Sequence, residues 1–265
     1  MRILIIPDIH CRNFWRKAID NNIDKVDKVI FLGDYLDPYP DEFKIPDNME
    51  CKSYYDTEGI LNMMNDIISL KKNEPNKYIL LCGNHVSSYI WPEFGGNNRT
   101  DRNNWKLYHN FFKENLTLFN FVWRENNAIF SHAGITEGWA NEFLRTLEYE
   151  DETLQPVSEC AQILIDTPLT DFNEYYLKRI GDISDFRGGD MFYGSCEWAD
   201  IREHIKKITS YKDNTFEGNG EEGIYQIFGH TQLNYKPLIC DKWACLDCKR
   251  GFIVDTITYE CQDCL

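Results

Sequence analysis

Short apolar runs recur along the chain, and each is followed by polar residues that can bind metal ions. The run Val29–Leu32 is rich in β-branched and aromatic residues, which favours a strand covered on both faces. Gly33 follows it and permits a tight turn before Asp34. Ligands bind at the carboxyl ends of strands in open α/β sheets, so these polar ends mark a candidate site. Five strand-like runs show this pattern: residues 3–6, 29–32, 78–82, 128–131 and 224–228.

Other segments have the three- and four-residue periodicity of helices with one apolar face. The clearest covers residues 53–72, where Ile60, Met64, Ile67 and Ile68 recur at helical steps. The prolines after Asp37 predict a loop that reaches about residue 48, and residues 91–96 read as irregular. The patterns predict further helices at 13–21, 103–114, 137–148, 158–166 and 198–208, and further strands at 118–123, 243–246 and 252–258.

Two histidines lie inside helical patterns, away from the strand ends. His109 falls among aromatic residues in the helix predicted over 103–114, and we expect a structural role for it. His204 falls in the middle of the pattern at 198–208, where we expect a solvated helix residue. Neither is therefore a predicted ligand.

Composition narrows the classes of partner. The 265 residues carry a formal net charge of −15, with 43% hydrophobic and 14% aromatic residues. Nucleic-acid duplexes and anionic membranes are held by fields of Lys and Arg, so both are poor candidates. A small phosphorylated substrate held by metal ions remains compatible with an acidic protein. With no export signal or apolar run long enough to span a membrane, we expect a cytoplasmic protein with reduced cysteines.

The polar ends form the series Asp8-Ile9-His10, Gly33-Asp34-Tyr35-Leu36-Asp37, Gly83-Asn84-His85, His132 and His230. This series resembles the signature of the calcineurin-like metallophosphoesterases. The single histidine of Gly229-His230-Thr231-Gln232 looks like the phosphoprotein-phosphatase and diadenosine-tetraphosphatase branch of that family. The resemblance implies an α/β fold, a four-layer α/β/β/α sandwich of two mixed β-sheets flanked by helices. Because the series runs from position 8 to position 230, one site needs most of the chain in one fold, and we expect a single domain over residues 1–265. The helical patterns at about 135–220 predict a cap-like insert near the site.

The resemblance further implies a centre of two divalent metal ions, with Asp34 as the shared carboxylate. Oxygen and imidazole ligands suit Mn, Fe or Zn, and the sequence does not choose among them. The implied ligands are Asp8 and His10 for the first ion, Asn84, His132 and His230 for the second, and Asp34 for both.

In that reading, a hydroxide that bridges the two ions attacks phosphorus in line, and no covalent enzyme intermediate is needed. His85 is the general-acid candidate that protonates the leaving alkoxide. Asp37 resembles the carboxylate that supports this histidine in the family.

The chain departs from the phosphoprotein-phosphatase pattern at Pro38, where an arginine usually binds the substrate phosphate. Another residue must supply that charge. Arg187, in the loop 186–190, is the predicted replacement, with Arg202 and Arg99 as alternatives.

Four cysteines near the end of the chain leave two readings open. Cys245 and Cys248 form one C-x-x-C pair, and Cys261 and Cys264 form another, a spacing found in zinc ribbons. The first pair also flanks Leu246-Asp247. This resembles the end of a strand in the family's sheet, and in that reading the cysteines are not zinc ligands.

The sequence thus predicts hydrolysis of phosphomonoesters, on a phosphoprotein or on a small phosphoester or nucleotide. A dinucleoside polyphosphate hydrolase is the second reading. A non-catalytic scaffold that retains the fold is the third, and the complete ligand series argues against it.

Overall fold

The computed structural model describes residues 1–39, 53–93, 99–148, 155–210, 215–234 and 236–264. Most of the loop predicted to reach residue 48, and part of the irregular segment 91–96, lie outside these ranges. The chain divides into two compact units, Met1–Phe119 with Lys249–Leu265, and Asn120–Cys248. That all 265 residues form one domain stays a prediction.

A six-stranded mixed sheet organises the first unit, in the order β13-β12-β1-β2-β3-β4. The strands β1, β2 and β3 run parallel, whereas β12 is antiparallel to β1. All four residues of β3 and three of the four in β2 are buried, as expected for parallel strands with both faces covered. The strands are β1 (Arg2–Ile6), β2 (Lys28–Phe31), β3 (Tyr78–Leu81), β4 (Phe119–Asn120), β12 (Phe252–Asp255) and β13 (Cys261–Asp263).

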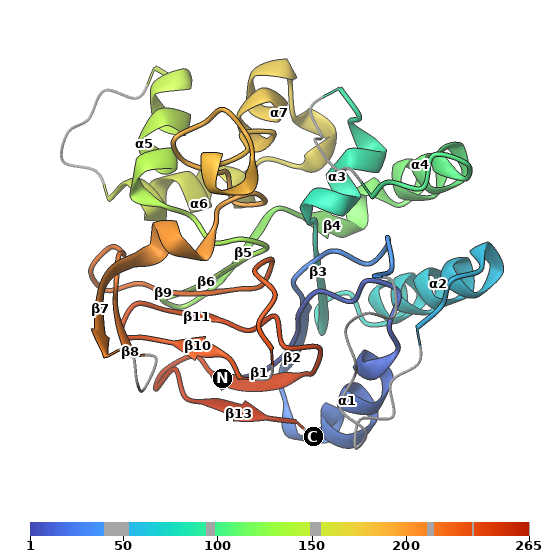
Figure 1. Ribbon diagram of the computed structural model, residues 1–265. Helices are drawn as coiled ribbons and strands as arrows, with labels where there is room; N and C mark the ends of the chain where they lie inside the picture. Colours follow the sequence, from blue (N-terminus) through green and yellow to red (C-terminus); the bar gives the residue numbers. More distant parts are fainter. Residues whose placement is uncertain (40–52, 94–98, 149–154, 211–214, 235, 265) are drawn as a thin grey trace. The chain divides into compact units, whose positions relative to one another are not determined.

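Helices α1 and α2 lie on the same side of this sheet, where α1 packs on β1 and α2 on β3 (Figure 1). The carboxylate of Asp56 accepts a hydrogen bond from the Gly59 N–H, so α2 begins at Thr57 rather than at residue 53 as predicted. The helices of this unit are α1 (Phe14–Asn22), α2 (Thr57–Asn73), α3 (Asn84–Ile90) and α4 (Trp105–Glu114).

Helix α3 has no counterpart among the predicted elements. It is only seven residues long, and its four polar residues are buried together with its three apolar ones, so the sequence gives too short a pattern to reveal a helix. It begins directly after β3 and Gly83, and therefore carries Asn84 and His85 in its first turn.

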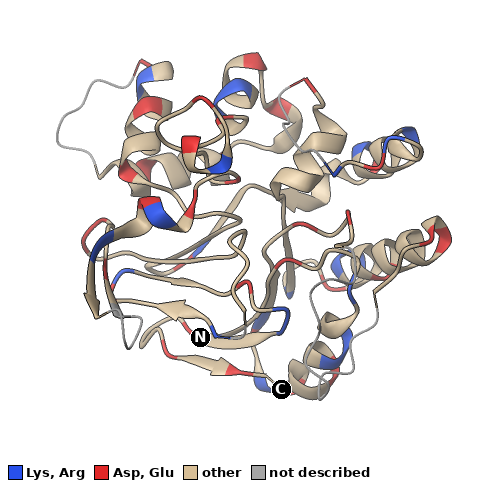
Figure 2. Cartoon of the chain, in the orientation of Figure 1, with Lys and Arg blue, Asp and Glu red and all other residues tan. Residues whose placement is uncertain are grey.

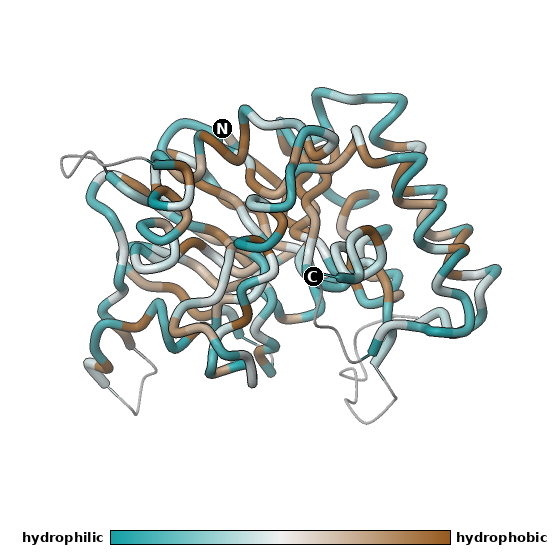
Figure 3. The backbone as a smooth tube through the Cα atoms, turned by 90° about the horizontal axis from the view of Figure 1, so that it is seen from above, coloured by the Kyte–Doolittle hydropathy of each residue, from teal (hydrophilic) through white to brown (hydrophobic). Residues whose placement is uncertain are grey.

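A second mixed sheet, in the order β10-β11-β9-β6-β5, forms the core of the second unit. Strand β9 lies between β6 and β11 and is parallel to both. Hydrophobic and hydrophilic stretches alternate along the backbone, as the hydropathy colouring shows (Figure 3). The strands are β5 (Val122–Glu125), β6 (Ala128–Ser131), β9 (Tyr225–Phe228), β10 (Leu238–Ile239) and β11 (Trp243–Cys245).

The described residues of the predicted insert at 135–220 form three helices and a hairpin, and the role of this insert as a cap stays a prediction. Helix α6 packs on both α5 and strand β5. The elements are α5 (Glu137–Thr146), α6 (Pro156–Asp166), α7 (Glu174–Ile180), β7 (Ile205–Ser210) and β8 (Thr215–Gly218). Short 3₁₀ turns occupy Ile23–Lys25, Leu116–Leu118, Leu169–Asp171, Asp185–Arg187 and Ile201–His204.

The helix predicted over 198–208 is wrong. Asp200 and Glu203 form a capping box around the single turn Ile201–His204, and the β-branched residues that follow pair with β8. His204 is correspondingly buried rather than solvated, because its ring packs 4.7 Å from that of Phe228.

Two mixed sheets with seven α-helices in the described part of the chain confirm the predicted α/β fold class.

Lys and Arg are interspersed with Asp and Glu in both units, as Figure 2 shows. None of the described helices is both long enough and apolar enough to cross a membrane.

Candidate active site

The carboxyl ends of β1, β2 and β3 meet at one edge of the first sheet. Ile6 pairs with Phe31, and Phe31 with Leu80, so the three loops that follow start side by side. The backbone N–H of His10 donates to the carbonyl oxygen of Asp34 at 2.7 Å, which ties the first loop to the second. The parallel register therefore gathers the polar ends predicted from the sequence.

Gly33 brings the second and third loops into contact. Its φ of +117° is unfavourable for any residue with a Cβ atom, and a Cβ there would lie 2.8 Å from the backbone nitrogen of Gly83. Only glycine permits this approach. Asp34 consequently stands next to the start of α3, where the backbone N–H of His85 donates to Asp34 Oδ1 at 3.0 Å.

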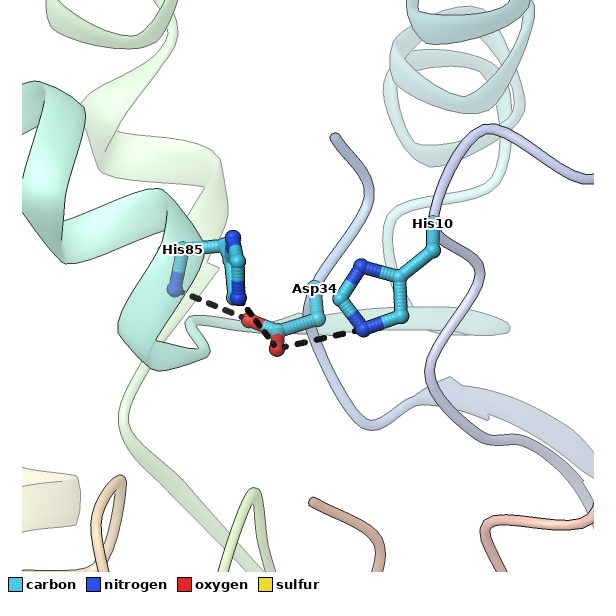
Figure 4. Close-up of side chains that lie close together, drawn as sticks. All are labelled: His10, Asp34 and His85. Atoms are coloured by element: carbon cyan, nitrogen blue, oxygen red, sulfur yellow. Dashed lines mark hydrogen bonds and ion pairs between the residues drawn. The ribbon is translucent and has the colours of Figure 1, made fainter. Parts of the chain in front are cut away.

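Asp34 is buried at the centre of a cluster with His10 and His85 (Figure 4). Asp34 Oδ2 lies 3.7 Å from His10 Nε2 and 3.9 Å from His85 Nε2. The backbone of Asp34 is left-handed at φ 46°, as are those of His10 at 44° and Asp37 at 58°. Such conformations cost of order 1–3 kcal/mol each, and they gather at functional sites.

The surroundings of His10 fit a bound cation. Its Nδ1–H donates to the carbonyl oxygen of Leu36 at 3.0 Å, a partner that assigns the tautomer and leaves a lone pair on Nε2. That lone pair faces carboxylate oxygens of Asp34 at 3.7 Å and Asp8 at 4.0 Å. The lone pair and the carboxylate oxygens repel one another. Burial lowers the pKa of His10 well below its ordinary value, so protonation of Nε2 does not relieve this repulsion. A metal ion between these atoms would relieve it.

His85 is held by a chain of hydrogen bonds that the sequence reveals only in part. Its Nδ1 lies 2.6 Å from Asp37 Oδ2, and the Tyr89 hydroxyl donates to Asp37 Oδ1 at 2.6 Å. The backbone N–H of Asp101 in turn donates to the Tyr89 hydroxyl oxygen at 2.8 Å. Tyr89 was not predicted, and its only signal is the four-residue spacing from His85, which has meaning only once α3 is known.

Of the three candidate arginines, Arg99 contacts His85. Its Nη2 lies 2.9 Å from His85 Nε2, and its Nη1 donates to the carbonyl oxygen of Asp37 at 3.1 Å. Arg187 and Arg202, in the second unit, both pair with Asp200, at 2.8 Å and 2.6 Å. Arg187 also donates to the Thr231 hydroxyl at 2.6 Å, next to His230 in the sequence.

In the second unit, His132 and His230 follow the parallel strands β6 and β9. The backbone N–H of Gly229 donates to the carbonyl oxygen of His132 at 2.8 Å, and His132 Nε2 lies 3.1 Å from His230 Nδ1. His230 has a left-handed backbone at φ 62°. The sheet therefore brings the two late histidines of the series together.

Buried imidazole and carboxylate groups in the first unit suit a divalent metal ion. Ligand atoms of His10, Asp34 and His85 all lie within 4.8 Å of one another. Asn84, which precedes His85 in the sequence, is also buried. These are groups that divalent metal ions take as ligands.

No cluster of potential metal ligands in the described residues contains a cysteine. The Cys245 thiol donates to the carbonyl oxygen of Gly229 at 3.4 Å, and Cys261 lies on the edge strand β13. Whether the two cysteine pairs bind zinc stays open.

Comparison with solved structures bears on the fold. A cold-active protein tyrosine phosphatase has a TM-score of 0.53 and 12% identity, over 96% of this chain and 73% of that chain. A protein serine/threonine phosphatase from Saccharomyces cerevisiae, with similarity to human phosphatase PP5, has a TM-score of 0.48 and 12% identity, over 96% and 72%. At this identity, the first likeness shows a shared fold alone.

Comparison with curated proteins found no match. The family model of the calcineurin-like phosphoesterases, in contrast, matches residues 1–232, which hold every member of the polar series from Asp8 to His230. The match agrees with the buried carboxylate and imidazole groups at the strand ends. The chain belongs to the calcineurin-like phosphoesterases, and is a phosphoester hydrolase.

Proposed function

We propose that the chain hydrolyses phosphomonoesters with two divalent metal ions, in the manner of the Ser/Thr phosphatase branch of its family. The observation that carries this proposal is the 2.6 Å contact between His85 Nδ1 and Asp37 Oδ2, beside the buried carboxylate of Asp34. This contact orients an imidazole at a site that suits metal ions. A general acid and a metal centre are the two components that hydrolysis of an alkyl phosphate needs.

The ligands follow the family pattern. The orientation of the His10 lone pair toward Asp8 and Asp34 supports a first ion at that place. Asp34 is proposed as the carboxylate shared by both ions, because it is the anion in the cluster with His10 and His85. The proposed ligands of the second ion are Asn84, His132 and His230, from the family pattern. Mn, Fe and Zn all suit this set.

Two bound ions would supply a nucleophile from water near neutral pH and neutralise charge on the phosphoryl oxygens. His85 has the second task, which is to give a proton to the leaving oxygen from Nε2. Asp37 accepts the Nδ1–H of His85, so it fixes the ring and stabilises the positive charge that the ring carries when both nitrogens are protonated. Tyr89 holds Asp37 in turn.

A dinucleoside polyphosphate hydrolase is the alternative. The single histidine of Gly229-His230-Thr231-Gln232 favours it as much as it favours a phosphoprotein phosphatase. Both activities would use the same ligands and the same acid, so the substrate decides between them. A scaffold without activity would have no need of the hydrogen bonds that hold His85 and Asp37.

The test is a Mn-supplemented assay of four substrates: an aryl phosphate, a phosphoserine peptide, a dinucleoside tetraphosphate and a bis-aryl phosphodiester. We expect turnover of the two monoesters to exceed turnover of the others. Turnover of the tetraphosphate alone would replace the proposed function by the alternative. Bound metal without turnover of any substrate would favour the scaffold.

A further inference from the structure

Two arginine side chains lie close to the ring of Tyr39 in the first unit. The guanidinium carbon of Arg99 lies 3.6 Å from the ring centroid, and that of Arg12 lies 5.5 Å from it. The edge of the Tyr39 ring packs against His10, with centroids 4.7 Å apart. Two fixed positive charges therefore stand beside the cluster around Asp34.

Arg12 is a buried cation whose contacts in the structure are weak. The residue is 4% exposed, and it donates to the carbonyl oxygen of Ile9 at a long 3.5 Å. Within the described part of the chain it forms no ion pair with a carboxylate. Burial of an uncompensated charge costs several kcal/mol, so the site gains if an anion occupies it.

Arg99 makes contacts that an anion could replace with stronger ones. Its Nη2 faces His85 Nε2 and its Nη1 the Asp37 carbonyl oxygen, both of which are neutral acceptors when His85 holds its proton on Nδ1. A phosphate offers two oxygens to the guanidinium fork, and such charge-assisted bonds are about twice as strong as neutral ones. Capture of Arg99 by phosphate would also release His85 Nε2, the atom that must carry the proton for the leaving group.

A cavity of about 220 Å³ reaches Arg99. Asp37 and Pro38 lie on its wall, with Tyr55 and Tyr108. Pro38 occupies the sequence position of the family's arginine, so the cavity lies where that side chain is missing. A ligand could thus approach the Arg99 guanidinium from this side.

From these contacts we propose that Arg12 and Arg99 together bind the phosphate group of the substrate, and so replace the arginine lost at Pro38. The proposal rests on the proposed function in taking the ligand to be a substrate phosphate. Two guanidinium groups favour a phosphomonoester, which carries two negative charges, over a phosphodiester, which carries one. The pair is therefore also a determinant of specificity for monoesters.

Calorimetric titration with inorganic phosphate tests the pair without reference to turnover. The proteins are wild type, Arg99→Ala, Arg99→Lys, Arg12→Met, Arg187→Ala and a control, Arg102→Ala. The side chain of Arg102 is exposed, three residues beyond Arg99. We expect Arg99→Ala and Arg12→Met each to weaken phosphate binding about 10-fold, the loss of one charge-assisted contact. Arg99→Lys should recover part of the loss, and the control should stay within twofold.

Thermal unfolding identifies variants that do not fold. Methionine is chosen at position 12 because it fills most of the volume of the buried arginine side chain, so the Arg12→Met variant should fold. In parallel, the ratio of kcat/KM for an aryl monoester to kcat/KM for the bis-aryl diester should fall in Arg99→Ala and in Arg12→Met. Unchanged phosphate binding in folded Arg99→Ala and Arg12→Met would overturn the proposal, as would a larger loss in Arg187→Ala. Phosphate bound through the pair without hydrolysis of any monoester would instead count against the proposed function alone.

Discussion

His85 Nδ1 lies 2.6 Å from Oδ2 of Asp37, and the other oxygen of that carboxylate accepts a hydrogen bond from the Tyr89 hydroxyl. The imidazole is thereby fixed with its Nδ1 side toward a carboxylate and its Nε2 side toward the cluster around Asp34. A histidine held in this way can transfer a proton at Nε2 without reorientation. This relationship makes the role of His85 separable from metal binding.

His85→Asn should leave metal binding intact and reduce the rate most on substrates with poor leaving groups. An alkoxide needs a proton in the transition state, whereas an activated aryl oxide departs with little help. We expect the loss on an alkyl phosphate to exceed that on nitrophenyl phosphate by on the order of 10²-fold. The measurement is kcat on both substrates, with metal content determined on the same samples.

Asp37→Asn should show the same dependence on leaving group more weakly, because the imidazole itself remains. His109→Asn is the control, since His109 stacks on Trp105 in α4 and donates to the carbonyl oxygen of Tyr89. Equal losses of His85→Asn on the two substrates, or loss of a metal ion, would mean that the acid lies elsewhere.

Tyr89→Phe should lower kcat by about 10-fold with little change in KM. It removes one hydrogen bond to the Asp37 carboxylate, and a bond to a charged group contributes about 1.5–3 kcal/mol. The ring should stay in place, because it packs against Tyr108 and Phe112. If Tyr89 acts through Asp37, the loss depends on the leaving group. A uniform loss on aryl and alkyl phosphates would assign it a structural role only.

The strand ends could be predicted because each combines a short apolar run with a polar residue, and Gly33 signals the turn between them. The contacts that hold His85 could not. Helix α3 is only seven residues long and its polar residues are buried together with its apolar ones, so the register of Tyr89 one turn after His85 stays hidden in the sequence. Arg99 lies 14 residues beyond His85 in sequence, and no periodicity indicates that the two side chains meet.

The error at 198–208 has a different origin. The apolar spacing there satisfies a helical template, but Asp200 and Glu203 close a single turn and the chain continues as the hairpin β7–β8. Pairing with a strand ten residues away overrode the local pattern. The helical pattern placed His204 in solvent, and the sequence gives no sign that its side chain is buried.

His204 makes the second unit sensitive to acid. Burial lowers the pKa of His204 to about 4, while its ordinary value in the unfolded chain is 6.5. Between these values the unfolded state binds a proton that the folded state does not, so stability falls as pH drops from 7 to 4. The difference corresponds to about 3 kcal/mol.

Denaturant unfolding of wild type and His204→Gln over this pH range measures the effect. Glutamine keeps a donor for the carbonyl oxygen of Ala133, which lies 3.2 Å from His204 Nε2. We expect the variant to lose the part of the pH dependence that belongs to the histidine. Identical slopes for the two proteins would show that His204 does not titrate as proposed.

Asp34→Asn is the most direct test of a metal centre built on one shared carboxylate. Asparagine keeps an oxygen that can accept the His85 backbone N–H, so the fold should survive while the negative charge is lost. Metal content and phosphate release from a phosphoserine peptide should be measured on wild type and variant purified in parallel with Mn. We predict two ions and turnover in the wild type. In the variant, metal affinity and kcat should each fall by on the order of 10²-fold or more. Two tightly bound ions and undiminished turnover in Asp34→Asn would contradict the account.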